Sequence, residues 1–261
     1  MGKKLFLKGA TLIDGTGKPA IENCGLLLNG EVIEKVTASE DFQASTEAEV
    51  VDMTGKTIMP GMINCHIHCI MEPIGDPFGL VAKESKVKTA IRGIVNLKKY
   101  LKTGVTFVRD LGAPGGIDID IRNSIKEGLI EGPGLLVSGK VITMTGGHGW
   151  PFGRESDGVD ECRKAAREQI KAGADVIKIM ATGGVMTPGV EPGSPQLSLE
   201  EMQAAVEEAN KAGKKTATHA QGTKGIKNAI LAGIDSVEHG IFLDDEVIEM
   251  MVERGVYLVP T

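Results

Sequence analysis

A recurring unit constrains the fold of this chain most: a helical segment ends in glycine, and a short strand rich in β-branched residues follows within a few positions. The unit occurs five times, with its glycines at Gly104, Gly173, Gly213, Gly233 and Gly255. Glycine just beyond the last helical turn is a typical C-terminal cap. Repeated alternation of helix and strand predicts a parallel sheet with helical crossovers.

The strands of these units, together with two more at 57–66 and 135–137, number seven. Polar side chains fall at their carboxyl ends, namely His66, His68, Asp110, Lys178, His219 and His239. In a (β/α) barrel the loops at that rim converge on one site, whereas the outer strands of an open sheet hold such residues too far apart. We therefore predict an α/β fold over residues 58–261, a (β/α)8-type TIM barrel that is incomplete because only seven strands are visible.

Residues 1–57 follow another pattern, with short strands separated by turns. Leu26–Leu28 and Val32–Ile33 flank Asn29-Gly30, a dipeptide favoured in the two-residue turn of a hairpin. This segment is expected to be a small, separate β unit.

Composition excludes several classes of function. A net charge of −6 with 3% aromatic residues argues against a nucleic-acid surface, which needs a basic stripe and stacking platforms. No stretch approaches the length of a transmembrane span, so no membrane association is expected. Four unevenly spaced cysteines are too few for a disulfide framework, which favours a cytoplasmic location.

The tripeptide His66-Ile67-His68 is the first candidate metal-binding feature. Residues two apart in a strand project from the same face, so both imidazoles can reach one ion, and imidazole suits zinc and its neighbours. Taken alone, the tripeptide fits an accidental alternation on a half-exposed strand equally well.

Three distant residues shift that balance. Lys178 interrupts an apolar strand, Val176–Met180, where it could extend to solvent or, if buried, lose its proton and react with carbon dioxide to give a carbamate ligand. His219 and His239, taken singly, are more typical of hydrogen-bonded core or loop histidines. They lie twenty positions apart across one strand-helix-strand unit, which brings their strand ends close together.

Five segments in this order resemble the amidohydrolase superfamily, in particular its prolidase-like and imidazolonepropionase-related group. They are Pro60–Ile63 leading into His66-Ile67-His68, Met144–Gly149, Ile177–Gly184, His219-Ala220 and Val237–Gly240. The resemblance implies a barrel beside a small β-sandwich, here residues 1–57. It also implies two divalent metal ions, with zinc the preferred metal. His66 and His68 would bind the more buried ion, His219 and His239 the more exposed one, and N6-carboxylated Lys178 would bridge both.

The activity that the resemblance implies is hydrolysis of amide C–N bonds by a metal-activated hydroxide, with dipeptides or N-acyl amino acids as the preferred substrates. The alternative is a cyclic-amide hydrolase of the imidazolonepropionase type, but those enzymes resemble single-metal proteins without the lysine. Lys178 therefore favours a binuclear, dipeptidase-like hydrolase, with Lys178 and His148 as catalytic residues.

Two further residues concern the substrate. His148, in a glycine-rich loop, is a candidate for holding the substrate carbonyl or carboxylate, and a turn histidine in solvent is an equally good interpretation. Gln221 is a second candidate for substrate binding. It stands where several dipeptidases have tyrosine, which leaves the substrate open. Asp110 would orient a ligand or loop, or form a simple ion pair at the strand end.

The chain departs from the family pattern at its end. Family members carry an aspartate on the eighth strand as metal ligand and proton shuttle, whereas the last strand here runs into Val259-Pro260-Thr261. Asp244 and Asp245 are poor substitutes because they are expected to cap a helix. We therefore expect a C-terminally truncated chain that forms a homo-oligomer or pairs with a missing C-terminal segment. Two other hypotheses stay open: a metal-binding fragment that is catalytically incomplete, and an open-sheet binding protein without metal.

Overall fold

The computed structural model of the protein describes residues 4–39 and 48–261. Its contacts divide the chain into two compact units, Met1–Gly61 and Met62–Thr261. The candidate site residues all belong to the second unit.

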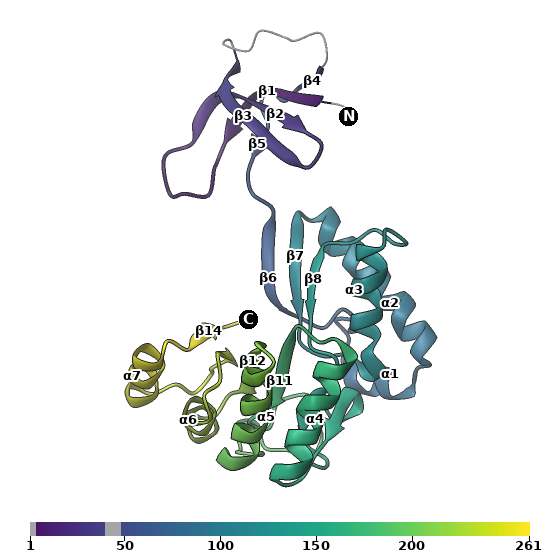
Figure 1. Ribbon diagram of the computed structural model, residues 1–261, viewed down its shortest axis with the longest axis vertical. Coiled ribbons are helices and arrows are strands. Elements are labelled where there is room, and N and C mark those ends of the chain that lie inside the picture. Colours follow the sequence, from purple (N-terminus) through teal and green to yellow (C-terminus); the bar gives the residue numbers. More distant parts are fainter. Residues whose placement is uncertain (1–3, 40–47) are drawn as a thin grey trace. The chain divides into compact units, whose positions relative to one another are not determined.

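The N-terminal unit is a sheet of short strands (Figure 1). Its strands are β1 (Lys4–Leu12), β2 (Ile21–Asn29), β3 (Val32–Ala38), β4 (Ala48–Asp52) and β5 (Thr57–Ile58). The order is β3-β2-β1-β4, with β5 also paired to β1. The predicted hairpin is confirmed, because Asn29 pairs with Val32 and Gly30 between them has φ +59°.

The β-sandwich implied for this unit is not confirmed. A sandwich needs two sheets packed face to face, and the described strands of this unit form one sheet. Its small core of Leu12, Cys24 and Leu26 is buried, while Val32 and Ile33 on the hairpin are 65% and 59% exposed.

The larger unit contains two parallel sheets. The first has the order β6-β7-β8, and the second has the order β10-β9-β11-β12-β13-β14. The strands are β6 (Met62–Ile67), β7 (Val105–Asp110), β8 (Gly134–Val137), β9 (Val141–Thr143), β10 (Gly153–Glu155), β11 (Val176–Met180), β12 (Lys215–Ala220), β13 (Ser236–His239) and β14 (Tyr257–Val259). Six of the seven predicted strands are present, and the strand predicted at 57–66 is divided into β5, which pairs with β1 in the N-terminal unit, and β6. The short strands β9 and β10 were not predicted.

Helices follow the strands and lie on the outside of the sheets (Figure 1). They are α1 (Pro77–Lys83), α2 (Lys86–Lys102), α3 (Ile117–Lys126), α4 (Val159–Ala172), α5 (Leu199–Lys211), α6 (Thr223–Ala232) and α7 (Asp245–Arg254), with short 3-10 turns at Pro114–Gly116 and Trp150–Phe152. The five glycines that define the repeating unit all have positive φ. The capping box of Ser198 and Glu201 is present at the start of α5. Local sequence signals therefore set the helix ends correctly.

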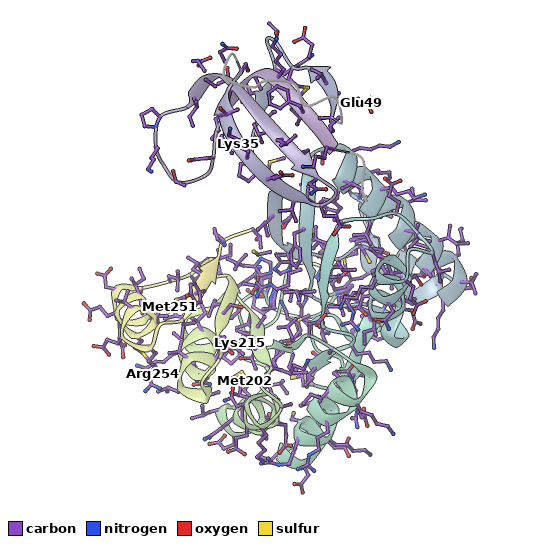
Figure 2. All side chains as sticks on the ribbon, turned by 45° about the horizontal axis from the view of Figure 1, so that its top comes forward. Lys35, Glu49, Met202, Lys215, Met251 and Arg254 are labelled. Carbon is purple, nitrogen blue, oxygen red and sulfur yellow. The ribbon has the colours of Figure 1, made fainter. Side chains whose placement is uncertain are left out.

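Buried apolar side chains fill the space between helices and sheets. Met202 on α5 and Met251 on α7 are labelled in Figure 2, and both belong to a core cluster that also contains Ile177, Ile179 and Val237. The four cysteines are free. Among the described helices, none combines the length and apolar character needed to cross a membrane.

The barrel wall is not closed within the described residues. A backbone hydrogen bond from Asp175 to Val137 (2.8 Å) links the two sheets on one side. On the other side β6 and β14 end their sheets without pairing, and Ile63 and Tyr257 on these edges are 66% and 76% exposed. The parallel α/β architecture is confirmed, but the wall is open between β6 and β14 because no described strand covers those edges.

Candidate active site

A cavity of about 120 Å³ lies at the carboxyl ends of the strands. All seven residues that the sequence singled out for metal or substrate binding line it, namely His66, His68, His148, Lys178, His219, Gln221 and His239. Apolar side chains complete the wall, namely Phe78, Phe152, Met180, Val185 and Met186. The structure thus brings together residues that are up to 173 positions apart in the chain (239 − 66).

The histidine rings form a connected series around this cavity. Ring centroids lie 5.4 Å apart for His66 and His68, 4.9 Å for His66 and His239, and 4.7 Å for His219 and His239. His148 continues the series at 4.1 Å from His219. The rings therefore lie within the range in which neighbouring imidazoles can share one or two small ligands.

His66 is held by a carboxylate. Its Nδ1 lies 2.9 Å from Oε2 of Glu238, which is completely buried. The other carboxylate oxygen accepts hydrogen bonds from Arg109 Nη2 (2.7 Å) and Ser236 Oγ (2.8 Å). Arg109 also donates to the carbonyl oxygen of Cys65 (2.6 Å), the residue before His66. This network leaves Nε2 of His66 without a hydrogen bond to any described residue.

His68 is held through the backbone around it. Its Nδ1 donates to the carbonyl oxygen of Gly112 (3.0 Å). Asp110 accepts hydrogen bonds from the amides of Cys69 (2.9 Å) and Gly112 (3.1 Å). No cation within residues 4–39 and 48–261 pairs with Asp110, so it orients the loops beside His68, and the ion-pair interpretation is wrong.

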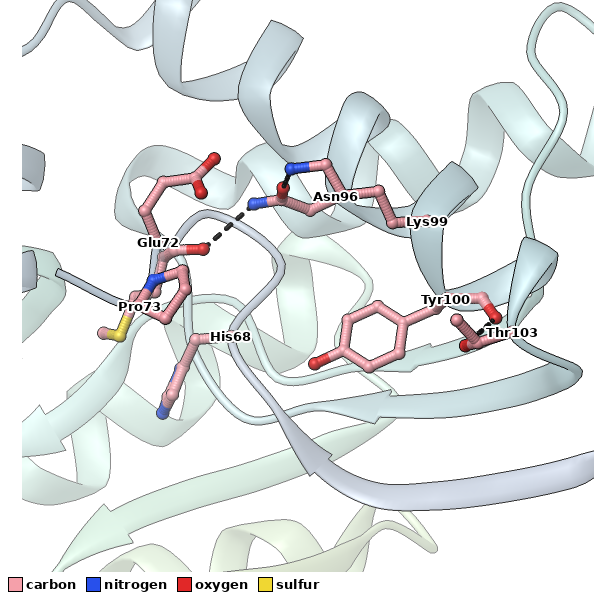
Figure 3. A pocket seen from close by; sticks show the side chains of 8 residues that line it. His68, Glu72, Pro73, Asn96, Lys99, Tyr100 and Thr103 are labelled. Atoms are coloured by element: carbon pink, nitrogen blue, oxygen red, sulfur yellow. Dashed lines mark hydrogen bonds between the residues drawn. The ribbon is translucent and has the colours of Figure 1, made fainter.

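A larger cavity of about 320 Å³ lies behind His68 (Figure 3). Asn96 in its wall donates to the carbonyl oxygens of Cys69 and Met71 (both 2.9 Å) and accepts from Lys99 Nζ (3.1 Å). Of the seven candidate residues, His68 alone lines this cavity. The smaller cavity is therefore the candidate site, and Asn96 anchors the segment that follows His68.

His239 reaches the cavity through an unusual backbone conformation. Adjacent strand residues point to opposite faces, yet Glu238 contacts His66 and His239 lines the same cavity. The alternation is broken because His239 has φ +76°, in the left-handed region. A non-glycine residue there costs about 1–2 kcal/mol, so the surrounding structure must hold this corner in place.

Lys178 lies in the middle of the fully buried strand β11 and is only 1% exposed. Its amine has no hydrogen-bond partner among the described residues, and the interpretation of a lysine extending to solvent is wrong. Burial lowers the pKa of this amine, Glu238 opposes the shift and Arg109 adds to it, and the resulting pKa is about 8. About a tenth of the amine is therefore neutral at pH 7.

The imidazoles of the site are neutral at pH 7. Burial, followed by the charge of Lys178, lowers the pKa of His148 to about 3 and that of His239 to about 4. Burial also lowers the pKa of His68 to about 4, and it places those of His66 and His219 well below their usual range. Neutral imidazole is the form that binds metal ions.

His148 is held beneath the loop that joins β11 to α5. It is 5% exposed, its Nδ1 lies 2.8 Å from Thr187 Oγ1, and its amide donates to Gln196 Oε1 (2.9 Å). Gly184 allows this packing, because a Cβ there would lie 2.4 Å from the imidazole. The interpretation of His148 as a turn histidine in solvent is therefore wrong.

The donor set fits a metal centre in its chemistry. No group of three or more His, Cys, Asp and Glu side chains in the described residues is close enough to hold an ion as placed. The candidate set instead combines neutral imidazoles with a buried amine. His66 and His68 each have Nδ1 bonded to an acceptor, which is the usual arrangement behind a metal-binding histidine.

Comparison with known proteins identifies the family of this chain. The model of the amidohydrolase family matches residues 57–261. The chain belongs to the amidohydrolase family.

Three related proteins resemble this amidohydrolase over nearly its whole length. The ochratoxinase of Aspergillus niger is 31% identical over 291 residues, which cover 99% of this chain and 59% of that protein. The crystal structure of a prolidase complexed with N-methylphosphonate-L-proline is 33% identical, covers 99% of this chain and 66% of that chain, and has a TM-score of 0.90. That of a Xaa-Pro dipeptidase with bound methionine in its active site is 31% identical, with coverage of 98% and 66% and a TM-score of 0.87. This amidohydrolase chain spans about three-fifths of the length of the ochratoxinase.

The sequence interpretation of this amidohydrolase missed Glu238 and Arg109. Each carries a charge directly after an apolar strand residue, Val237 before Glu238 and Val108 before Arg109. A buried charge needs a partner, and opposite charges on two strands could have suggested this pair.

Proposed function

We propose that this chain hydrolyses amide C–N bonds in dipeptides or N-acyl amino acids with the help of divalent metal ions. The observation that carries the proposal is the convergence of four neutral imidazoles and one buried amine, from β6, β11, β12 and β13, on one cavity. The names of the prolidase and Xaa-Pro dipeptidase relatives support the substrate class.

In this proposal His66 and His68 hold one cation, and His219 and His239 hold the other. Lys178 serves both after carboxylation, in which its neutral amine forms a bond to the carbon of carbon dioxide and releases one proton. Two cations in such a site supply Lewis acidity, which lowers the pKa of a bound water to about 7 and polarises a carbonyl group. Zinc is the metal we would test first.

The chain's own residues bind the substrate and exclude water. His148 is fixed by Thr187 and Gln196, and we assign it to the substrate carbonyl or carboxylate. Gln221, 9% exposed on the cavity wall, offers an amide for the same end of the substrate. Phe78 and Phe152 form the apolar part of the wall, which limits the access of bulk water to the reacting carbonyl.

A second candidate is a metal-binding unit that needs an additional carboxylate for turnover. Proton transfer to a leaving nitrogen requires a positioned acid or base. No aspartate or glutamate is among the residues that line this cavity, and Glu238 behind it is already bonded to His66 and Arg109.

Metal content and turnover test the proposal together. The chain is loaded with zinc, manganese or cobalt, dialysed, analysed for bound metal, and assayed against Xaa-Pro dipeptides and N-acyl amino acids. We expect up to two ions per chain and hydrolysis. The double variant His66→Ala, His68→Ala should lose at least one of these ions and should lose hydrolysis. Cys65→Ala is the matched control, because this exposed side chain lies on the same strand and does not line the cavity.

Equal metal in the wild type and the double variant contradicts the site. Metal binding without hydrolysis of any substrate supports the second candidate, and hydrolysis restored by a carboxylate-bearing segment of a longer relative would establish it.

A further inference from the structure

The two sheets of the larger unit contribute different halves of the candidate metal site. His66 lies in β6 of the three-stranded sheet and His68 directly follows that strand, whereas Lys178, His219 and His239 come from the six-stranded sheet. The sheets are linked between Asp175 and Val137 on one side, but they do not pair between β6 and β14. On this open side, a side-chain contact can set the spacing between the halves.

Glu238 makes such a contact. From β13 in the six-stranded sheet its carboxylate reaches His66 on β6 (2.9 Å) and Arg109 on β7 (2.7 Å), both in the three-stranded sheet. Glu238 is completely buried, and Arg109 and His66 are nearly so, with 17% and 10% of their side chains exposed. A hydrogen-bonded charge pair at such depth is little screened by solvent and resists separation.

The contact also fixes the chemical form of His66. A carboxylate can only accept hydrogen bonds, so Nδ1 of His66 carries the proton and Nε2 keeps its lone pair. Arg109 supports the same ring a second time, because it holds the carbonyl oxygen of the preceding residue, Cys65 (2.6 Å).

The residue next to Glu238 is His239, whose left-handed backbone turns it into the cavity. The distance from the His66 ring to the His239 ring, 4.9 Å between centroids, is therefore set by one short segment. Glu238 fixes the position of the His66 ring, and the left-handed backbone at His239 fixes the position of the His239 ring.

We infer that Glu238, held by Arg109, is a positioning residue that sets the spacing between the two halves of the metal site and the tautomer of His66. The inference rests on the proposed function where it concerns metal, and on the hydrogen-bond geometry alone where it concerns the tautomer.

The experiment compares Glu238→Gln and Glu238→Ala with Glu208→Gln. Glu208 is a matched control, since it is 7% exposed and pairs with Arg163, Arg167 and Lys211 on the outer helices, away from the cavity. Zinc affinity is measured by competition with a chromogenic chelator. Loss of a carboxylate behind a metal-binding histidine typically weakens binding by about 10–100-fold. We expect this loss in Glu238→Gln, a larger loss in Glu238→Ala, and none in Glu208→Gln.

The second readout needs no metal. Long-range ¹H–¹⁵N spectra of the metal-free protein report which ring nitrogen carries the proton. We expect protonated Nδ1 at His66 in the wild type and in Glu238→Gln, whose amide oxygen still accepts a hydrogen bond, and a mixture of tautomers in Glu238→Ala. Because Glu238→Gln preserves shape, the affinity test does not depend on folding of the alanine variant.

Zinc affinity within twofold of the wild type in both Glu238 variants would overturn the inference, as would an unchanged His66 tautomer in Glu238→Ala. If the wild type binds no zinc, the proposed function fails, and the tautomer in the metal-free proteins still decides the role of Glu238.

Discussion

The partly buried carboxylates Asp175 and Asp235, near the amino ends of the parallel strands, differ from the buried Asp110 and Asp118 near the carboxyl ends. At the amino ends, carboxylates are paired: Asp235, just before β13, accepts from Lys215 and from the amide and hydroxyl of Thr216, and Asp175, just before β11, pairs with Arg122. Burial raises the pKa of Asp235, but these hydrogen bonds outweigh it and lower the pKa overall. Lys215 is labelled in Figure 2.

Two buried carboxyls near the carboxyl ends have no cation as a partner among the described residues, in contrast to Glu238, which pairs with Arg109. Asp110 and Asp118 are completely buried, and burial raises the pKa of Asp110 to about 6 and, with the charge of Asp110, that of Asp118 to about 7. Buried polar atoms without a hydrogen-bond partner among the described residues also gather here, namely Asp118 Oδ1, Ser138 Oγ, Thr143 Oγ1 and Gln196 Nε2.

The difference teaches where stability and chemistry reside in this unit. Paired charges at the amino ends stabilise the folded chain. Around the cavity, a buried amine, two buried carboxyls that pair with no described cation and a strained histidine are retained at the expense of stability, as is common at functional sites. Substitutions at the two ends should therefore have opposite consequences.

The largest expected effect is that of Lys178→Met. We expect hydrolysis to fall by about 10²–10³-fold or more, because the ligand that we propose to be shared by both cations is lost. In the metal-free protein the same change should stabilise the fold by up to about 3 kcal/mol at pH 7, since burial holds the amine pKa at about 8 against 10.5 when exposed. Rates and denaturant unfolding measure the two effects.

Lys215→Met is the matched control for Lys178→Met, because its side chain is 82% exposed. It should change neither rate nor metal content. A metal-free Lys178→Met protein that is less stable than the wild type would contradict the comparison.

The next largest effect is expected in the pH dependence of the unfolding free energy. Because the folded-state pKa values of Asp110 and Asp118 lie above the unfolded value near 4, the folded chain holds more protons between about pH 4 and 7, and its unfolding free energy falls as pH rises through this window. Asp118→Asn should flatten that decline and stabilise the protein at pH 7.5 by a few kcal/mol. Urea unfolding at several pH values measures it.

Asp120→Asn is the matched control, because Asp120 is exposed on the same helix, α3. This variant should have the same pH profile of stability as the wild type. The comparison of the two ends is weakened if Asp118→Asn destabilises the chain across the whole range.

A smaller effect is expected at Gly184. Its replacement by alanine places a Cβ 2.4–2.6 Å from three atoms of the His148 ring, so the ring or the loop must shift, at a cost of about 1–3 kcal/mol. Hydrolysis should fall more than metal binding does, because His148 is assigned to the substrate. Gly75→Ala, where nothing lies within 4 Å of the added Cβ, should be neutral in both assays.

The smallest effect on metal binding and hydrolysis is expected for Asp235→Ala, just before the amino end of β13. Loss of its hydrogen bonds to Thr216 leaves buried donors unpaired and should destabilise the fold by about 1–3 kcal/mol. Zinc affinity and rates below the melting temperature should match the wild type. Reduced zinc affinity in this variant would show that the two ends are not independent.

The fold of the larger unit and the membership of the site follow largely from sequence. Glycine caps and β-branched strands are local signals, and the carboxyl ends of parallel strands share one rim, so the positions of His66, Lys178 and His219 could be predicted together. The strands β9 and β10 could not, because three-residue strands in a glycine- and threonine-rich stretch carry little periodicity.

Other features depend on contacts between distant residues. The strand pattern predicts that Glu238 and His239 face opposite sides, and only the backbone reveals the left-handed turn that lets Glu238 contact His66 while His239 lines the cavity. The support of His66 by Glu238 and Arg109 joins residues 129 to 172 positions apart. The single sheet of the N-terminal unit likewise depends on packing that its turns do not specify.

The corner at Glu238 and His239 has a consequence for how this chain can vary between species. An insertion or deletion of one residue between Ser236 and Gly240 would exchange the directions of both side chains at once, so that His66 loses its support and the cavity loses an imidazole together. A change of length in this segment would therefore remove both contributions in one step, whereas a substitution at Glu238 or at His239 removes only one of them.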